Sequence, residues 1–406
     1  MRYTIGQLAE IIDGDRGKNY PKQDEFYPQG YCLFLNTGNV TKEGLIFEEN
    51  QFIMKEKDEA LRKGKLKRGD IVYTTRGTVG NAGYYNSSVP YENVRINSGM
   101  VILRSNGEIV DARFLYQILK SEYYRPYFKQ YCTGSAQPQL PIKNFSQIYL
   151  NVPDIKTQHR IADILSVYDN LSENNQKQIK LLEEAAQRLY KEWFVDLRFP
   201  GHENTKIVDG VPEGWQYEKL GDLVKTTSGG TPSRRKSEYY VNGNIRWIKT
   251  KELNDRFIFE TEEHITEDAV KNSSAKVLPE GALIVAMYGA TIGKIGITAA
   301  EMACNQACCA FISFDDMISK EYLYCWLMDN REYLVSQGKG AAQSNLSQEM
   351  IRNFSLLCPD KKVIKNFTEI VTTMLENKRV LENKILMLSK ARDDLLPKLM
   401  SGEVEV

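Results

Sequence analysis

The stretch TTRGTVGNAG, Thr74–Gly83, decides the fold because much of it occurs twice. Its segment TVGNAG, Thr78–Gly83, aligns with TIGKIG, Thr291–Gly296, 213 positions later. The same offset aligns Tyr27, Gly30, Phe34, Thr37 and Val40 with Tyr240, Gly243, Trp247, Thr250 and Leu253. Further on, the offset becomes 206 and aligns Gly134, Ala136, Gln137 and Leu140 with Gly340, Ala342, Gln343 and Leu346. These ordered matches indicate that a unit of ~200 residues has been duplicated.

The glycine spacing of this stretch does not fit a nucleotide-binding loop. Gly77, Gly80 and Gly83 are three residues apart, whereas phosphate-binding motifs read G-x-x-x-x-G-K-[ST] or G-x-G-x-x-G before a helix. In the second copy, Ile295 and Ile297 flank the last glycine and favour a strand there. We therefore interpret the stretch as a glycine-rich β turn that brings its backbone close to another group.

Each copy begins with a segment of mixed secondary structure. Short β-rich runs lie between Gly, Asn and Pro turns, at Asp70–Thr75, Met100–Leu103 and Ala282–Ala286. An aromatic helical stretch follows in each copy, at Asp111–Tyr131 and at Lys320–Ser336.

Each copy ends in a long predicted helix. Neither Pro nor Gly occurs between Asp154 and Pro200 or between Asp360 and Pro397, and the expected N-caps are Asp154 or Thr157, and Asp360. A first stripe recurs every seven residues in both helices, at Ile161, Tyr168, Asn175, Leu182 and Leu189 and at Phe367, Met374, Leu381, Leu388 and Leu395. A second stripe is expected at Ile164, Leu171 and Ala185, and at Val371 and Ile385.

An amphipathic helix of this length cannot bury its stripe alone, so we expect the two helices to pack on each other. The predicted fold class is α+β, with two mixed α/β domains in a duplicated chain, separated by two long antiparallel helices that form a coiled coil. The predicted segments are a first domain 1–153, a helix 154–199, a linker 200–215, a second domain 216–359, and a second helix with the C-terminal tail 360–406. Asn175 either fixes the register or marks a partly hydrated seam.

The composition is that of a globular cytoplasmic protein, with 42% hydrophobic and 26% charged residues. No run approaches ~18 consecutive apolar residues, so no membrane span is expected, and no signal peptide is recognised. Seven cysteines without a small-scaffold pattern indicate reduced thiols. The net charge is zero, which weakly disfavours nucleic-acid binding, but basic side chains cluster at 55–70 and 225–251.

One pattern resembles the catalytic motif of a metal-dependent endonuclease. Asp360 is followed by Glu376-x-Lys378 and by Glu382-x-Lys384. On a long helix, these side chains are expected to be solvated and to point away from one another, so we do not predict a catalytic site.

Other catalytic and metal-binding patterns are weaker. Cys304, Cys308 and Cys309 lack a second ligand pair and are expected on a buried strand. The histidines lie far apart, and neither a loop for S-adenosylmethionine nor a target-base motif is recognisable. We therefore do not expect the chain to be an enzyme.

Several short segments stand out for their order along the chain. They are Ser228–Ser233, Gly243–Lys249, Glu192–Gly201 (EWFVDLRFPG), Val211–Trp215 (VPEGW) and Leu395–Glu403 (LLPKLMSGE). The first two resemble the opening of the target-recognition domains of type I restriction–modification specificity subunits. The others resemble the central conserved region and the tail of that family. The helix starts depart from the family's Glu-Gln, with Thr157-Gln158 in one copy and Lys361-Lys362 in the other.

The resemblance implies a non-catalytic subunit that binds double-stranded DNA at a bipartite asymmetric sequence, with one half-site for each recognition domain. The helices would serve as the spacer and as the docking surface for two methyltransferase subunits. Restriction–translocase subunits would join for cleavage. S-adenosylmethionine would belong to the methyltransferase, and this chain is expected to hold neither a cofactor nor a metal.

Candidate DNA-contacting residues are the types that hydrogen-bond to base edges or phosphates. At the glycine turns they are Thr75, Arg76, Thr78 and Asn81, and Tyr288, Thr291 and Lys294. The segments before the long helices supply Gln137, Gln139, Gln343 and Asn345, which either contact DNA or brace the helix start. Phosphate contacts or solvated surface charges are expected of Arg234, Arg235, Lys249 and Lys251.

Two other classes of protein stay open. One is a duplicated coiled-coil scaffold that binds only protein, which the basic clusters weakly disfavour. The other is a self-contained endonuclease or methyltransferase, which the missing motifs disfavour.

Overall fold

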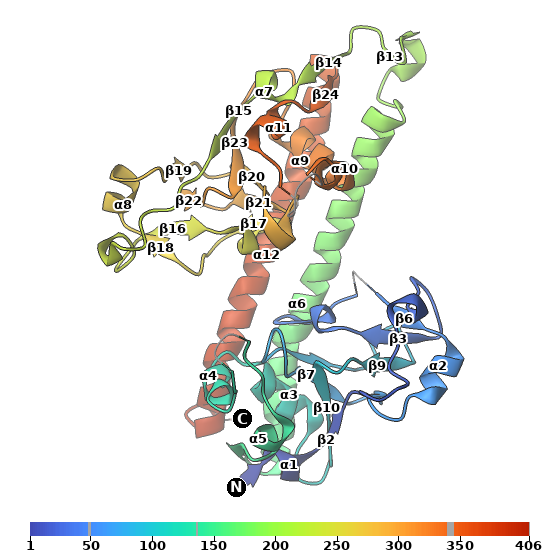
Figure 1. The fold of residues 1–406 in the computed structure, drawn as a ribbon, viewed down its shortest axis with the longest axis vertical. Coiled ribbons are helices and arrows are strands. Elements are labelled where there is room, and N and C mark those ends of the chain that lie inside the picture. Colours follow the sequence, from blue (N-terminus) through green and yellow to red (C-terminus); the bar gives the residue numbers. More distant parts are fainter. Residues whose placement is uncertain (48–49, 135–136, 339–344, 406) are drawn as a thin grey trace. The chain divides into compact units, whose positions relative to one another are not determined.

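A computed structural model describes residues 1–47, 50–134, 137–338 and 345–405. The chain divides into two compact units (Figure 1). Unit 1 comprises Met1–Ser172 and Met387–Val406, and unit 2 comprises Glu173–Leu386. Each unit therefore contains one mixed domain and a part of both long helices. None of the helices in the described ranges combines the length and the apolar character needed to cross a membrane.

A four-stranded antiparallel sheet of unit 1 has the order β2 (Ala9–Asp13), β10 (Met100–Ser105), β7 (Ile71–Thr74), β8 (Ala82–Tyr84). A three-stranded sheet has the order β6 (Phe52–Ile53), β3 (Cys32–Leu35), β9 (Val94–Ile96), with β3 and β9 parallel. The other strand pairs are β1 (Arg2–Thr4) with β11 (Tyr149–Asn151), and β4 (Val40–Thr41) with β5 (Gly44–Leu45). The shorter helices are α1 (Ile5–Leu8), α2 (Lys55–Ala60), α3 (Ala112–Lys120), α4 (Arg125–Lys129) and α5 (Ile142–Ser146), with 3₁₀ turns at Gln23–Glu25 and Thr37–Asn39.

Unit 2 repeats this topology. Its five-stranded sheet has the order β15 (Val224–Ser228), β23 (Cys308–Phe314), β20 (Leu283–Ala286), β21 (Ile295–Thr298), β17 (Arg256–Ile258). A four-stranded sheet has the order β18 (His264–Ile265), β16 (Ile245–Ile248), β22 (Met302–Cys304), β19 (Val277–Leu278). The shared order of β2-β10-β7-β8 and β15-β23-β20-β21 confirms the duplication.

Several other elements of unit 2 have counterparts in unit 1. β14 (Gln216–Lys219) pairs with β24 (Ser355–Cys358), as β1 pairs with β11. A hairpin before it joins β12 (Ile207–Val208) and β13 (Val211–Pro212). The shorter helices are α7 (Leu220–Leu223), α8 (Glu267–Lys271), α9 (Lys320–Asp329), α10 (Arg331–Gln337) and α11 (Gln348–Arg352), with 3₁₀ turns at His202–Asn204, Ser237–Tyr239, Thr250–Glu252 and Gly289–Thr291.

The predicted strands are confirmed, but each predicted aromatic helix is broken. The first breaks between α3 and α4, where Pro126 lies in the first turn of α4 and cannot donate a backbone hydrogen bond to a preceding turn. The second breaks at Asn330, which separates α9 from α10.

The two long helices are α6 (Ile155–Tyr190), which continues as a π-helical turn at Lys191–Val195, and α12 (Lys361–Ser401). Asp154 Oδ1 accepts hydrogen bonds from the backbone N–H groups of Lys156 and Thr157 at 3.1 Å. Asp360 Oδ1 accepts one from Lys362 at 2.7 Å. The prediction that Asp154 and Asp360 cap these helices is therefore confirmed.

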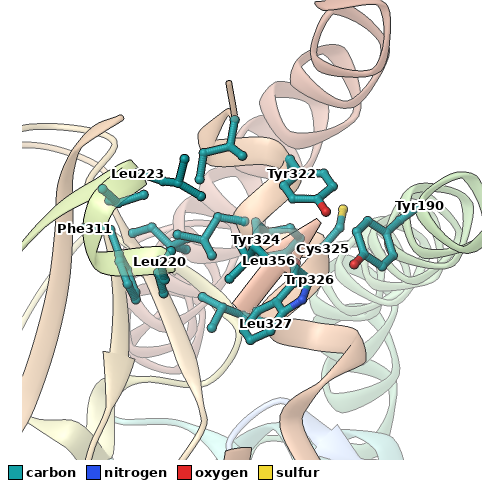
Figure 2. Packing of buried hydrophobic residues seen from close by; sticks show 14 of the residues in the cluster. Tyr190, Leu220, Leu223, Phe311, Tyr322, Tyr324, Cys325, Trp326, Leu327 and Leu356 are labelled. Atoms are coloured by element: carbon teal, nitrogen blue, oxygen red, sulfur yellow. The ribbon is translucent and has the colours of Figure 1, made fainter. Parts of the chain in front are cut away.

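Within unit 2, the two helix segments run antiparallel. The end of α6 packs on the start of α12, where the Phe194 and Phe367 ring centroids lie 4.9 Å apart. Further along, Ile179 packs with Leu381 and Ile385. Helix α9 lies against the same seam, and Tyr190 faces Tyr322 and Cys325 there (Figure 2). The core of the second domain is thus continuous with the helix seam.

The prediction of the second stripe of α6 is wrong by one position for two of its three residues; the third, Ile164, is partly buried and packs against the core of the first domain. Leu171 and Ala185 are exposed, whereas Leu165, Ile179 and Ala186 are buried. These residues lie four positions after members of the first stripe instead of three. The mixed domains cover this side of the helix, as the Cys325 Sγ contact to the Ala186 carbonyl in unit 2 shows.

The prediction that the charged residues of the endonuclease-like pattern are solvated is wrong for two of them. Lys378 is only 1% exposed and Glu382 8%, whereas Glu376 and Lys384 are exposed. Lys378 lies seven residues after buried Val371, in the seam stripe of α12. The pattern is therefore split between the buried seam and the surface.

Candidate nucleic-acid interface

The stretch Thr74–Gly83 forms a tight turn between β7 and β8. Thr74 N donates to Asn81 O at 2.9 Å, and Gly80 N donates to Thr74 O at 3.0 Å. Gly77 and Gly80 have φ values of 70° and 100°, in the left-handed region that favours glycine. Because the turn leads directly into β8, the prediction of a glycine-rich β turn is confirmed.

The same turn recurs in unit 2, between β20 and β21. Ala286 N donates to Lys294 O at 2.9 Å, and Gly293 N donates to Ala286 O at 2.9 Å. Gly289 and Gly293 have φ values of 76° and 78°. The two turns therefore share their backbone hydrogen bonds, although several of their side chains differ.

A loop between β9 and β10 lies against the glycine turn of unit 1. The backbone N–H groups of Thr75 and Arg76 donate to Gly99 O at 2.9 and 3.1 Å. Gly99 N in turn donates to Asn97 Oδ1 at 2.8 Å. The side chain of Asn97 thus shapes the loop, and Ser98 lies at its middle position with a partly exposed side chain.

Unit 2 contains the same loop between β22 and β23. Met287 N donates to Ala307 O at 2.8 Å, and Ala307 N donates to Asn305 Oδ1 at 3.1 Å. Gln306 lies at the middle position, is exposed, and accepts a hydrogen bond from Thr231 Oγ1. Sequence reasoning missed both loops, because their only shared polar residue is the asparagine, too weak a signal to find them.

The segment before each long helix also joins its glycine turn. Leu140 N donates to Thr75 O at 2.9 Å, and Leu346 N donates to Met287 O at 2.9 Å. The residues before these leucines form backbone bridges, Gln139 with Thr133 and Asn345 with Tyr288. Three segments therefore meet in each unit: the glycine turn, the asparagine loop and the segment before the long helix. We call this set the recognition edge.

Many of the predicted DNA-contacting residues are exposed at a recognition edge. In unit 1 they are Arg76, Thr78, Gln137 and Gln139; in unit 2 they are Tyr288 and Asn345, with Thr291 partly exposed. Gln343 lies outside the described residues.

Other predicted residues have partners inside their own domain. Thr75 is buried and its Oγ1 donates to Gly99 O at 3.1 Å. Asn81 is also buried, and its Nδ2 donates to Val40 O at 2.9 Å. Lys294 Nζ lies 3.0 Å from a carboxylate oxygen of Asp255. These side chains brace the turns, so the prediction of DNA contact depends mainly on the exposed residues.

Equivalent arginines, 206 positions apart, brace the two glycine turns. Arg125 Nη1 donates to Asn81 Oδ1 at 3.4 Å, and Arg331 Nε donates to Gly293 O at 3.1 Å. They start α4 and α10. Sequence reasoning missed them, although the offset of the repeat aligns them.

The basic cluster at 225–251 is partly neutralised by glutamates that follow it in the sequence. β16 pairs with β18 and brings the segment before β18 alongside. Arg234 lies 2.6 Å from Glu263, and Lys249 lies 2.5 Å from the same residue. Hydrogen bonds from Lys251 and Lys249 lower the pKa of Glu262 to about 2. Three of the four residues predicted to contact phosphate, Arg234, Lys249 and Lys251, are therefore already in ion pairs within the domain.

Arg235, the fourth predicted phosphate contact, is exposed, and its side chain makes no hydrogen bond or ion pair with the described part of the chain. Arg234 is also held by ring contacts, with its guanidinium 4.3 Å from the centroid of Tyr240. Of the two arginines, Arg235 is therefore the one whose guanidinium is not already engaged by another described residue.

The three cysteines of the C-x3-C-C pattern lie on or at the ends of strands, as predicted. Cys304 ends β22, and Cys308 and Cys309 begin β23; all three are buried. Burial raises the pKa of Cys309 to about 12, so its thiol is protonated at neutral pH. No group of three or more His, Cys, Asp or Glu side chains suited to a metal occurs among the described residues.

Known proteins resemble the chain over most of its length. The family described as "Type I restriction modification DNA specificity domain" matches residues 1–184 and 212–387. The HindI specificity subunit of Haemophilus influenzae is 27% identical, over 98% of this chain and 100% of the relative. The MjaIX specificity subunit of Methanocaldococcus jannaschii is 26% identical, over 86% of this chain and 81% of the relative.

A solved structure has the same fold. The type I restriction–modification S subunit from M. genitalium matches with a TM-score of 0.52 and 16% identity, over 98% of this chain and 95% of that one. The duplicated topology and the family match agree with the resemblance found in the sequence. The chain belongs to the family of type I restriction–modification DNA specificity subunits.

Proposed function

We propose that the chain selects a bipartite, asymmetric sequence in double-stranded DNA, with one half-site contacted by each recognition edge. The observation that carries this proposal is that the two edges share a backbone scaffold but present different side chains. Equivalent hydrogen bonds align Thr75 with Met287, so Arg76 and Ser98 in unit 1 stand where unit 2 has Tyr288 and Gln306. Different donors and acceptors on the same scaffold suit the recognition of different base pairs.

The long helices, in this proposal, hold the two edges at a fixed spacing and bind the partner subunits. Their exposed apolar side chains support protein docking, because these lie outside the seam: Val167, Leu171, Leu181, Val380 and Met387 are 47–64% exposed. Two methyltransferase subunits would bind S-adenosylmethionine and modify the DNA, and restriction–translocase subunits would join the same complex. This assembly would act in the cytoplasm.

Sequencing of methylated bases tests the proposal. The chain would be co-expressed with its native methyltransferase subunit in a host that lacks other methylation. We expect methylation at a single bipartite motif, and none when either chain is expressed alone. The scaffold alternative predicts no methylated motif that depends on this chain.

Arg76→Ala in the same assay tests the edge itself. Arg76 is exposed and its side chain makes no hydrogen bond or ion pair with the described residues, so the substitution removes no internal bond. We expect the Arg76→Ala complex to methylate sites that carry base-pair substitutions in one half-site. If the methylated motif is unchanged, the glycine turn of unit 1 is not part of the DNA interface.

A further inference from the structure

Asp255 clamps the glycine turn of unit 2 from outside the recognition edge. Its carboxylate accepts hydrogen bonds from Lys294 Nζ at 3.0 Å and Ile295 N at 3.0 Å, at the end of the turn. It also forms a two-point ion pair with Arg331, whose Nε holds Gly293 O. Asp255 itself has a φ of 62°, in the left-handed region that a non-glycine residue seldom adopts. The glycine turn of unit 2 is thus held by Asp255, a residue with an unusual left-handed backbone conformation.

The same backbone position is attached to the long helices. Lys378 Nζ on α12 donates to Asp255 O at 2.5 Å and to Tyr324 Oη at 3.1 Å, and it lies 2.6 Å from Glu183 on α6. Burial alone would lower the pKa of Lys378, but Tyr324, Glu183 and Glu382 around it raise the pKa above its ordinary value. A charged, buried Lys378 therefore joins both helices to the segment that holds the turn.

Unit 1 makes the same connection with different residues. Lys120 Nζ on α3 lies 3.4 Å from Glu43 O, in the turn between β4 and β5, and 3.0 Å from Asp169 on α6. Arg392 on α12 completes this cluster at 2.9 Å from Asp169. Asn81, in the glycine turn, donates to β4 through Val40 O. At the offset of the repeat, Glu43 aligns with Arg256, the neighbour of Asp255.

The two clusters are not copies of each other in sequence. The central cation is Lys120 of the mixed domain (α3) in unit 1, but Lys378 of the long helix α12 in unit 2. Buried ion pairs are on average no more stable than well-packed apolar side chains of the same volume. A connection made in both units from different residues therefore points to a role beyond the stability of the core.

We propose that each cluster positions the glycine turn of its own unit for base contact, with Lys120 and Lys378 as the positioning residues. This inference rests on the proposed function, because it assumes that the glycine turns face DNA. Neither lysine belongs to a recognition edge. Each acts indirectly: Lys378 holds the carbonyl of Asp255, and Lys120 holds that of Glu43 beside β4, which Asn81 contacts. Recognition of a base edge tolerates a displacement of only ~0.5 Å.

The test compares Lys120→Met and Lys378→Met in the full chain, in complex with the methyltransferase. Sequencing of methylated bases gives the methylation of genomic sites with one mismatch in either half-site. We expect Lys378→Met to raise methylation at mismatches in one half-site about fivefold or more, and Lys120→Met to do so in the other. Lys378→Arg, which keeps the charge, should restore discrimination. Lys384→Met, on the exposed side of the same helix, is the matched control.

The outcomes separate this inference from the proposed function. Equal loss of methylation at all sites, or relaxation of the same half-site by both variants, would overturn the positioning role. If Lys378→Met does not fold, Asp255→Asn replaces it, because asparagine also adopts left-handed backbone angles; the same half-site must then relax. Absence of any bipartite motif for the unsubstituted complex would defeat the proposed function instead.

Discussion

Arg392 of α12 and Asp169 of α6 form an ion pair in which Nη1 lies 2.9 Å from Oδ1. Lys378 of α12 and Glu183 of α6 form another, at 2.6 Å. On each helix the two charged residues are 14 positions apart, which is two heptads, with both acids on α6 and both bases on α12. A slip of one heptad would leave all four charges without these partners. The pairs therefore select one antiparallel register.

In the cluster of Asp169, Lys120 and Arg392, we expect substitution of the acid to destabilise the fold more than substitution of the arginine. Asp169→Asn leaves Lys120 and Arg392 buried without a full counter-charge, which should lower the free energy of unfolding by about 3–5 kcal/mol. Arg392→Met leaves Asp169 paired with Lys120, so a smaller loss of about 1–2 kcal/mol is expected. Urea denaturation of the two variants measures both values, with exposed Lys390→Met as the control. A greater loss for Arg392→Met would contradict this account of the cluster.

The raised pKa of Glu382 leads us to expect that the folded state becomes less stable as the pH rises towards about 7. Burial raises its pKa to about 7, although Lys378, the backbone N–H of Phe257 and Arg256 lower it. Between the unfolded pKa and about pH 7 only the folded state binds this proton, so stability falls as the pH rises and the loss is complete above that range. Glu183, on α6, also raises this pKa.

The measurement compares Glu382→Gln with the unsubstituted chain. Glutamine does not titrate in this range. The melting temperature of the Glu382→Gln variant minus that of the unsubstituted chain should therefore increase from pH 5 to pH 8. The difference in stability should be on the order of 3 kcal/mol at most. An offset that is the same at both pH values would show that Glu382 is ionised throughout.

Gln306 is expected to contribute to base discrimination in one half-site. Its position in the asparagine loop is occupied by Ser98 in unit 1, while in both loops the asparagine side chain accepts the same hydrogen bond from a backbone N–H. Gln306→Ser should relax one base pair of the motif and leave the other half-site unchanged, a loss of about 1–3 kcal/mol of discrimination. Sequencing of methylated bases measures it. Gln130→Ser, in the exposed C-cap of α4, is the control.

Glu262 and Glu263 are expected to restrain binding to the DNA backbone. They pair with Arg234, Lys249 and Lys251, so Glu262→Gln with Glu263→Gln should free these cations for phosphate. Affinity for unrelated duplex DNA should rise, and its dependence on salt should become steeper by about 1–2 in the slope of log K against log salt. Fluorescence anisotropy over a salt series gives the slope. An unchanged slope would place this cluster away from DNA.

Removal of one heptad from each helix tests the spacer. Residues 173–179 of α6 and 382–388 of α12 lie between the two ion pairs, so their joint deletion keeps both pairs in register. Each helix would shorten by ~10 Å, which corresponds to about three base pairs. The methylated motif should keep its half-sites and lose about three base pairs of spacer. A spacer of unchanged length would show that the helices do not set it.

Features of this fold could be predicted from the sequence where the sequence pattern is repeated along the chain or depends only on neighbouring residues. The glycine turns were found because six consecutive positions align at one offset. Asp154 and Asp360 were expected to cap the helices because capping needs only neighbouring residues. The asparagine loops were not found, since a loop that closes on a distant turn through backbone atoms leaves almost no trace in side-chain identity.

The sequence by itself determined the duplication, the strands of both domains and the long helices, because periodicity and turn residues act over short distances. Only the tertiary structure decided which charges are free. Lys378 and Glu382 look like surface residues until α6 and the second domain close over them. Likewise, the lysines and arginine of the basic cluster look like phosphate contacts until strand pairing brings Glu262 and Glu263 beside them. Burial and ion pairing depend on neighbours from distant parts of the chain, so a linear pattern does not contain them.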